Sequence, residues 1–290
     1  MRRPNVSIVI PAYNEETHLR LCLEAVARQT VKPFEVIVVD NNSTDATAAI
    51  ARSFPFVTLL SEKKQGPQPA RDRGYNAARG EVIGRLDGDS IIAPDWVETI
   101  QKLFADPSVD AATGTVRYRE VCARQLFDTL DSYFRSWLAH RAKPLGEQSM
   151  QGVNTAIRKS AWLVVRDAVC QERRHHEDLD LSAHLALLKR KVVFEPLMVV
   201  TASFRQGNAR PFVFYDYVIS TPRTYRLHGL RLHRDMYFVA WLVIAVYLPI
   251  RMAYRGYNPS TGRFSLKCLL SPQVTTNRPS PVATSITPLE

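Results

Sequence analysis

The sequence has little cysteine and no cysteine pair of the C-x-x-C type. Its four cysteines, Cys22, Cys122, Cys170 and Cys268, lie far apart along the chain. Zinc ribbons and small disulfide frameworks are built from closely spaced cysteines, so this spacing argues against both classes. We therefore expect reduced thiols and a cytosolic compartment.

Long hydrophobic runs are also missing. The C-terminal apolar run, residues 236–250, is uncharged over fifteen residues between Arg234 and Arg251, whereas a full membrane span needs about twenty apolar residues. Residues 1–5 are basic but lead directly into a strand-like run, so we expect no signal peptide. The chain contains no internal repeat.

Acidic residues are scarce in the C-terminal third. Residues 203–290 contain eleven Lys and Arg against three Asp and Glu, in a chain whose net charge is +10. This excess predicts an anionic partner. Nucleic acid fits poorly, because the aromatic residues cluster with long aliphatic ones instead of spacing out as stacking platforms. For residues 236–250 we expect an interfacial or re-entrant membrane helix, with a single span or a buried soluble helix as alternatives.

The N-terminal part alternates strand-like and helical patterns. With 290 residues and 46% hydrophobic content, the chain can bury one main core. Apolar runs at 6–10, 34–39 and 57–60 are separated by helical patterns, which predicts parallel strands in an α/β fold. We expect Asn14 to cap the first helix and residues 65–69, rich in helix breakers, to form a loop.

Further elements follow along the chain. The pattern predicts strands at 110–116, 154–158 and 192–194, the last ended by Pro196, and a helix at 177–188.

A short apolar strand is followed directly by Asp87, Gly88 and Asp89. Two carboxylates at the end of a strand can hold a hard divalent cation through oxygen, and the glycine between them permits the turn. Polar turns at 11–14 and 40–42 follow two other strands, so all three turns should meet at one edge of the sheet. The alternative is an ordinary solvated Asp-Gly turn.

As an ordered set, these residues resemble glycosyltransferase family 2. The resemblance is carried by residues 6–15, 38–45, 66–74, 87–89 and 177–178, and it covers about residues 5 to 205. It implies a GT-A fold, which is a Rossmann-like mixed sheet flanked by helices. It also implies an inverting transfer of a sugar from a nucleotide-diphosphate donor.

The resemblance implies roles for individual residues. The residues that it places at the donor are Pro11, Ala12, Tyr13, Glu15, Asp40, Arg71 and Asp87. Asp40 would bond the base, commonly uracil, and Asp89 with Asp87 would hold Mg2+ or Mn2+ on the diphosphate. Such a cation offsets the charge that develops on the leaving group. Asp72 stands where the family commonly has Asn.

Glu177 and Asp178 match the family's acidic pair near the acceptor. We favour Asp178 as general base, with Glu177 second. From the residues alone, both carboxylates have the alternative of stabilising a helix N-terminus. One of His175 and His176 is a candidate accessory metal ligand, with a partly exposed histidine as the alternative.

Two loops are candidates for contact with the acceptor or a phosphate. Gly152 and Asn154 lie where the family often has an acceptor-side loop, although a Gly-Asn turn needs no functional reason. Arg205 and Arg210 bracket a basic loop that would close over the diphosphate or an acceptor phosphate, unless it is a solvated cluster. This loop lacks the Q-x-x-R-W motif of processive synthases, which disfavours a polymerising enzyme.

We therefore predict a GT-A domain at 1–205, a basic and apolar helical section at 206–270 that associates with a membrane, and a disordered tail at 271–290. The predicted function is sugar transfer from a nucleotide donor, with UDP expected, to a lipid-linked or cell-surface glycan acceptor. The predicted location is the cytoplasmic face of the cell membrane. Alternatives are a polyprenyl-phosphate glycosyl transferase and a non-catalytic, membrane-associated protein that binds nucleotide sugars.

Overall fold

The computed structural model describes residues 2–119, 150–170, 175–203, 210–258 and 263–265, with isolated positions between 129 and 142. These residues divide into two compact units. The N-terminal unit takes its described residues from 1–117, 146–171 and 177–202, and the C-terminal unit from 118–145, 172–176 and 203–290. The domain boundaries at 205 and 270 stay predictions, and the tail at 271–290 lies outside the described residues.

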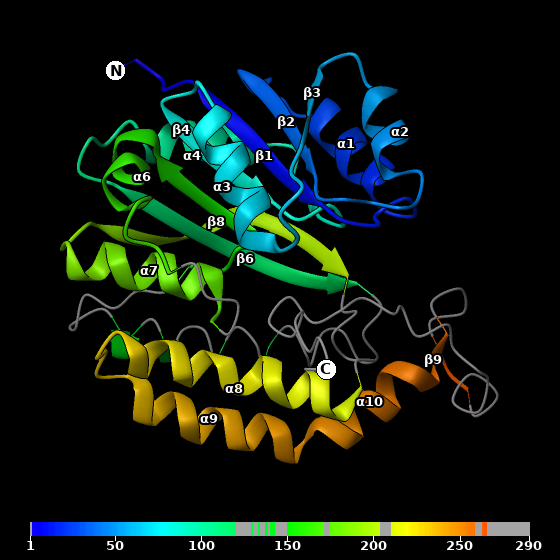
Figure 1. The fold of residues 1–290 in the computed structure, drawn as a ribbon, viewed down its shortest axis with the longest axis vertical. Helices are drawn as coiled ribbons and strands as arrows, with labels where there is room; N and C mark the ends of the chain where they lie inside the picture. The colour runs from blue at the N-terminus through cyan, green and yellow to red at the C-terminus, as the bar shows by residue number, and fades with distance from the viewer. Residues whose placement is uncertain are drawn as a thin grey trace, which may run out of the picture. The chain divides into compact units, whose positions relative to one another are not determined.

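The N-terminal unit is a mixed sheet with helices on both faces, as Figure 1 shows. Its strands are β1 (Val6–Ala12), β2 (Glu35–Asp40), β3 (Val57–Ser61), β4 (Val82–Leu86), β5 (Ile91–Ile92), β6 (Ala111–Arg119), β7 (Asn154–Arg158) and β8 (Val192–Ser203). Its helices are α1 (Leu19–Ala27), α2 (Thr47–Arg52), α3 (Pro67–Ala77), α4 (Trp96–Leu103), α6 (Lys159–Val165) and α7 (Glu177–Leu187). The predicted α/β class is confirmed.

The sheet is mixed, with the strand order β3-β2-β1-β4-β7-β6-β8-β5. Strands β3, β2, β1 and β4 run parallel to one another, whereas β7 is antiparallel to both β4 and β6. Strand β7 therefore runs against the strands on both of its sides, and β4 is the strand at which parallel pairing gives way to antiparallel pairing.

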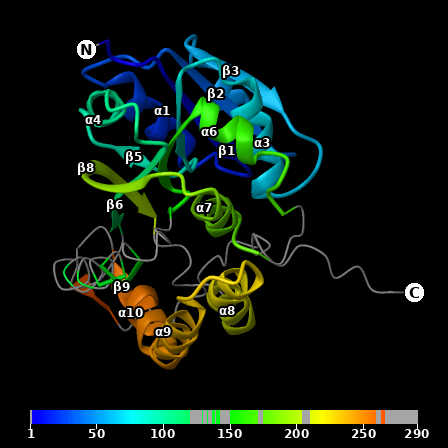
Figure 2. The same cartoon turned by 90° about the vertical axis from the view of Figure 1, so that its left-hand side faces the viewer.

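Strand β1 is buried on both faces, which explains its continuous apolar sequence. Ile8 and Ile10 pack into the core under α1 and α4, whereas Val9 between them packs into the core under α3 and α6. Figure 2 shows these two pairs of helices on opposite sides of the sheet. The period of two along the strand therefore fills both layers.

One buried amide joins four elements of this unit. The side-chain oxygen of Asn154, at the start of β7, accepts a hydrogen bond from the indole of Trp96 on α4 at 2.9 Å. Its nitrogen donates to the carbonyl oxygens of Thr115 on β6, at 2.9 Å, and Met198 on β8, at 2.7 Å. Asn154 is fully buried, so these bonds satisfy an amide that would otherwise be costly to bury.

Three local predictions are wrong. Asn14 does not cap α1, whose N-cap is His18; instead Asn14 has a φ of 51° and bonds a neighbouring loop. Residues 65–69 are not all loop, because α3 begins at Pro67, and proline suits a first turn that has no N–H partner. Strand β8 does not end at Pro196 but continues to Ser203.

The described part of the C-terminal unit is mainly helical. It contains α8 (Pro211–Leu227), α9 (His233–Ala245), α10 (Tyr247–Gly256) and a short hairpin of β9 (Tyr257–Asn258) and β10 (Arg263–Phe264). Helices α8 and α9 lie side by side in Figures 1 and 2. Within the described residues, no single helix is long and apolar enough to span a membrane; α9 and the first part of α10 meet the length and composition only as a pair, bent by 49°.

The carboxylate of Glu35 ties the start of β2 to two other segments. It accepts hydrogen bonds from the Ser7 hydroxyl at 2.7 Å, from the Arg79 backbone N–H at 2.6 Å and from Arg79 Nε at 3.0 Å. Partial burial acts to raise the pKa of Glu35, but these bonds and the positive charge of Arg79 outweigh it and lower the pKa below 4.5. Ionised Glu35 therefore stabilises the fold.

We predict that Glu35→Gln lowers the free energy of unfolding by about 1–3 kcal/mol at pH 7, because hydrogen bonds to a charged acceptor are lost. A lowered folded-state pKa gives stability that is complete above the unfolded value near 4.5 and is lost as the pH falls through the folded value. Urea unfolding from pH 3 to 7 should show the two proteins converging below pH 4.5. A difference that stays constant to pH 3, or an equal loss in the exposed control Asp167→Asn, would contradict this assignment.

Candidate active site

The C-terminal ends of the parallel strands lie at one edge of the sheet. β1 and β2 are in register so that Ala12 stands beside Asp40, and the Asn41 N–H donates to the Ala12 carbonyl at 2.9 Å. The buried Asn41 amide then donates to the carbonyls of Glu62 and Lys64 and accepts from the Gly66 N–H. The loop between β3 and α3 is therefore fastened to the end of β2.

The turn after β1 is fastened to the loop after β2. The Asn14 side-chain oxygen accepts from the Thr44 N–H at 2.9 Å, and the Glu15 N–H donates to the Thr47 hydroxyl at 2.7 Å. The Glu15 side chain is buried, and its atoms lie so close to Gly88 that a Cβ there would come within 2.8 Å of them. Glycine at position 88 therefore avoids a clash with Glu15, whereas its φ is not in the left-handed region, so the expected need for glycine in the turn itself is not the reason.

Asp87 and Asp89 follow the buried strand β4 at this same edge. The side chain of Asp87 is 43% exposed, whereas Asp89 is buried. Displacement of water by the surrounding protein raises the pKa of Asp87 to about 7. Arg85 opposes this rise, while the negative charges of Asp89, Asp178 and Glu177 add to it. Carboxylates that repel one another in this way provide oxygen ligands suited to a hard cation.

A buried arginine in β4 joins three carboxylates. The guanidinium of Arg85 donates from Nη1 to Asp178 Oδ1 at 2.5 Å and from Nη2 to Glu177 Oε1 at 2.6 Å. Nη2 also lies 3.4 Å from Asp87 Oδ1. Although burial opposes the charge, the carboxylates of Glu177, Asp178 and Asp87 raise the pKa of Arg85 well above its usual value. The end of β4 and the start of α7 are therefore held together by charge.

A second buried arginine, on α3, contacts the start of α7. Arg71 is fully buried and donates from Nε and Nη2 to Asp72 Oδ1 at 2.9 and 2.7 Å. Its Nη1 donates to the Glu177 carbonyl at 2.9 Å and lies 3.3 Å from Glu177 Oε2. Burial raises the pKa of Glu177, which lies between these two arginines. Asp72 thus supplies a counter-charge where the family commonly has a neutral Asn.

Asp178 is held by both of its carboxylate oxygens. Oδ2 accepts from the Gly152 N–H at 2.8 Å, while Oδ1 accepts from Arg85. A Cβ at position 152 would lie 2.2 Å from Oδ2, so only glycine lets the backbone approach this closely. The side chain of Asp178 is 23% exposed against 11% for Glu177. Asp178 is therefore oriented by two donors and is the more accessible of the two carboxylates.

The structure brings most of the predicted site residues to one edge of the N-terminal unit. The residues at or beside this edge are Pro11, Ala12, Tyr13, Glu15, Asp40, Arg71, Asp87, Asp89, Gly152, Glu177 and Asp178. Pro11, Tyr13 and Asp40 are partly exposed there. Arg71 is instead fully buried, where it positions α7.

Five predicted residues lie elsewhere or are not described. Asn154 is fully buried, and its amide is used by Trp96, Thr115 and Met198, so its contact with an acceptor stays a prediction. Arg205 lies outside the described residues. Arg210 and the pair His175 and His176 belong to the C-terminal unit.

Arg85 was not predicted as a site residue, although it lies two residues before Asp87. A single arginine in the five-residue strand Val82–Leu86, which is buried throughout, was the available signal. A buried guanidinium requires carboxylate partners, so it should have been matched to the nearby acidic pairs. Asn14 and Asn41 were also missed as the residues that fasten the loops.

Comparison with known proteins agrees with this arrangement. Glycosyltransferase GlyA of Streptococcus pneumoniae is 33% identical over 215 residues, which is 70% of this chain and 31% of GlyA. The chain thus spans about a third of the length of this curated relative. The mannosyltransferase PcManGT of Pyrobaculum calidifontis, in complex with GDP-Man and Mn2+, matches with a TM-score of 0.59 at 18% identity, over 92% of this chain and 78% of that one. TarS 1–349 of S. aureus, in complex with UDP-GlcNAc, matches at 0.54 and 16%, over 87% and 72%.

The two structures have sequences too distant to show more than a common fold, which is the GT-A-like mixed sheet with flanking helices. The family assignment comes from the sequence. Residues 7–193, well over half of the chain and including every element of the site edge, match the family described as Glycosyl transferase family 2. The chain therefore belongs to glycosyl transferase family 2, as its ordered motifs predicted.

Proposed function

We propose that the protein transfers a sugar, with inversion, from a nucleotide-diphosphate donor, UDP being the first candidate, to an acceptor at a membrane surface. The observation that carries this proposal is the Arg85 bridge. It brings the donor-side carboxylate Asp87 and the acceptor-side carboxylate Asp178 to a single guanidinium. Similar structures described with GDP-Man or UDP-GlcNAc support a nucleotide-sugar donor.

Asp87 and Asp89 are the residues that would hold Mg2+ or Mn2+. Their oxygen-only donor set is the kind that these hard cations prefer, and the neighbouring carboxylates leave an excess of negative charge at this edge. Bound there, the cation offsets the charge that develops on the leaving diphosphate. The description of PcManGT with Mn2+ supports this choice of metal.

Asp178 is the proposed general base. Its two oxygens are oriented by Arg85 and by the Gly152 N–H, yet the side chain keeps more exposure than Glu177. A carboxylate held in this way can accept the proton of an acceptor hydroxyl as its oxygen attacks the sugar. Glu177, buried between two arginines, is better placed to position α7.

The proposed membrane contact rests on helices α9 and α10. Phe238, Trp241 and Leu242 share one face of α9 by their i, i+3, i+4 spacing, and Phe238 and Trp241 are 66% and 60% exposed. Leu248 and Met252 are also exposed on α10. Large apolar side chains exposed in this number are typical of a surface that lies in a bilayer interface.

Charge supports the same surface. In the described part of the C-terminal unit, Asp216 lies 3.4 Å from Arg223 and Asp235 lies 3.1 Å from Arg141, so both acidic groups face a cation. Arg231 and Arg234 are exposed at the start of α9. This positive excess would attract the anionic cytoplasmic leaflet of the cell membrane. A lipid-linked or cell-surface glycan acceptor would be presented at such a surface.

The first experiment is calorimetric titration of UDP, GDP and TDP in Mn2+ or in EDTA. We expect one nucleotide to bind, the binding to require metal, and Asp89→Ala to weaken it at least about 100-fold because a ligand to the cation is lost. The exposed carboxylate Asp95 offers a matched control, and Asp95→Ala should bind as wild type. Binding that ignores both metal and Asp89 would reject the donor site.

Removing the base should affect the chemical step. We predict that Asp178→Asn lowers kcat by about 10²–10⁴-fold with a hydroxyl acceptor, because proton removal is lost. Calorimetry should show that Asp178→Asn binds the nucleotide as wild type does. Glu177→Gln should change kcat by a different factor from Asp178→Asn. Activity that survives Asp178→Asn would favour a polyprenyl-phosphate acceptor, whose oxygen needs no base. If the protein binds a nucleotide but neither transfers a sugar from any donor nor hydrolyses any donor slowly, the non-catalytic alternative is favoured.

The membrane surface can be tested with vesicles. The triple variant Phe238→Ser, Trp241→Ser, Leu242→Ser should lose at least about 10-fold in partitioning to phosphatidylglycerol vesicles, because apolar area no longer leaves water. Sedimentation of wild type with neutral phosphatidylcholine vesicles should be weaker. Leu187→Ser, Leu188→Ser, which changes exposed leucines of the N-terminal unit, should partition as wild type. If the triple variant and the Leu187→Ser, Leu188→Ser control partition equally, the proposed membrane contact of α9 is wrong.

A further inference from the structure

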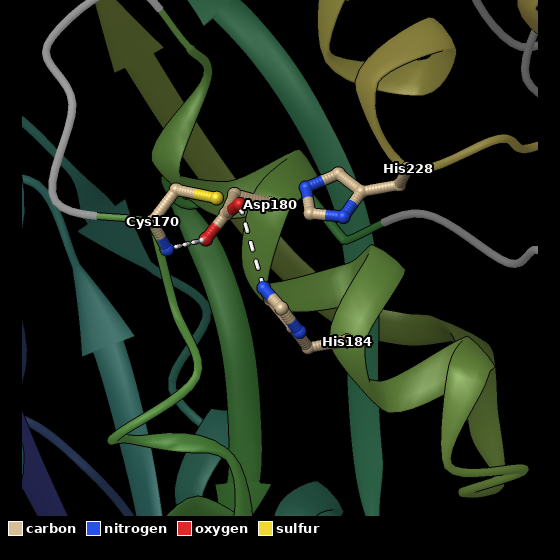
Figure 3. A group of neighbouring side chains, drawn as sticks. All are labelled: Cys170, Asp180, His184 and His228. Atoms are coloured by element: carbon tan, nitrogen blue, oxygen red, sulfur yellow. Dashed lines mark hydrogen bonds and ion pairs between the residues drawn. The ribbon is translucent and has the colours of Figure 1, made fainter.

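We propose that Cys170, Asp180 and His184 form a second divalent-metal site in the N-terminal unit, one of the zinc type. Figure 3 shows their side chains pointing toward one another beside the first turns of α7. The potential ligand atoms of the three residues all lie within 4.8 Å of one another. His228, which Figure 3 also draws, belongs to the C-terminal unit and is not counted among the ligands.

The backbone arranges these three groups before any metal binds. Asp180 and His184 are four residues apart on α7, so their side chains share one face of the helix. His184 Nε2 lies 3.7 Å from Asp180 Oδ1, while the Cys170 N–H donates to Asp180 Oδ2 at 2.9 Å. That bond holds the thiol-bearing residue against the carboxylate. In a tetrahedral zinc site neighbouring ligand atoms lie about 3.3–3.8 Å apart, so only a small contraction is needed.

The ligand chemistry separates this site from the one at Asp87 and Asp89. Thiolate, imidazole and carboxylate together are typical of Zn2+, whereas Mg2+ and Mn2+ take oxygen ligands. Three protein ligands leave a fourth position for water. Asp180 is buried. A bound cation would offset the cost of burying its negative charge between an imidazole and a thiol.

The position of the site suggests what the metal does. Positions 178 and 180 lie on nearly opposite faces of α7, so the metal ligand Asp180 points away from the side on which Asp178 meets Arg85. A cation would therefore hold α7 on the face opposite to Asp178. It would join this helix to Cys170, which follows α6, without touching the reacting groups. A metal that binds the folded chain and not the unfolded one stabilises the fold.

The simpler explanation of the same contacts is a backbone hydrogen bond to Asp180 and an ion pair between Asp180 and His184. That arrangement requires neither the thiol nor a metal. The metal site and this simpler explanation differ in whether the Cys170 thiolate binds a metal. Cobalt can replace zinc, and thiolate ligation of cobalt produces an intense near-ultraviolet charge-transfer band. The sulfur can thus be observed directly, with no measurement of activity.

The experiment uses the full chain, stripped of metal in a phosphine reductant and titrated with Co2+ while its absorption spectrum is recorded. We expect the thiolate band at one equivalent and its displacement by Zn2+. Cys170→Ser should abolish the band and weaken Zn2+ binding at least about 100-fold, because loss of a mere supporting residue already costs about 10–100-fold. His184→Asn should weaken Zn2+ binding to a similar degree, and it provides a second test if Cys170→Ser fails to fold.

Two matched variants assign the signal. Asp89→Ala removes a ligand of the proposed donor cation, and Cys268→Ser removes a thiol elsewhere in the chain; both should keep the cobalt band. Mn2+-dependent nucleotide binding should persist in Cys170→Ser, so failure of this proposal and failure of the donor site are distinguishable. Absence of a thiolate band in wild type, or a band that persists in Cys170→Ser, would overturn the proposal.

Discussion

The buried charge of Arg85 constrains the whole site. Burying a guanidinium is costly unless carboxylates surround it with good hydrogen-bond geometry. Arg85 bonds Glu177 and Asp178 from α7 through its two Nη atoms and lies 3.4 Å from Asp87 at the end of its own strand, while its buried Nε has no hydrogen-bond partner among the described residues. The position of α7 relative to β4 is thereby set by charge as well as by packing. The acidic pair Glu177 and Asp178 is held at a fixed distance from the Asp-Gly-Asp turn.

The junction in the sheet gives this arginine its importance. β4 is parallel to β1 on one side and antiparallel to β7 on the other. The parallel strands are followed by the polar turns that we propose for the donor, whereas α7, which carries the carboxylates proposed for the acceptor side, lies between β7 and β8 in the chain. Arg85 lies on β4, the strand at which parallel pairing gives way to antiparallel pairing. The two arginines Arg71 and Arg85 do not balance the four carboxylates that they contact, which leaves a negative edge for a cation.

The sequence allowed prediction of the elements and of which polar residues lie together, because both depend on local patterns. Continuous apolar runs identify β1, β2 and β4, and the polar residues at their ends identify the edge that we propose for the site. Interactions between distant segments could not be read in this way. The pairing of Arg85 with Asp178 joins positions 93 residues apart, and the hydrogen bond from Thr44 to Asn14 joins positions 30 apart.

Proline was misleading for a different reason. Its effect depends on whether its neighbours need an N–H donor, and that requirement is set by tertiary structure. At the start of α3 no donor is needed, so Pro67 begins the helix instead of preventing it. In β8 the strand continues through Pro196, whose carbonyl accepts a hydrogen bond from the Thr115 hydroxyl at 2.9 Å.

The Asn154 amide has a consequence for the order of folding. Its three partners are 58, 39 and 44 residues away along the chain, so the amide is satisfied only after α4, β6 and β8 have all reached β7. Any partly assembled sheet that buries Asn154 leaves at least one of its polar atoms unpaired, at a cost of about 1–3 kcal/mol. Such intermediates are disfavoured relative to the complete sheet. We therefore expect β6, β7 and β8 to join the four parallel strands in one cooperative step, late in folding.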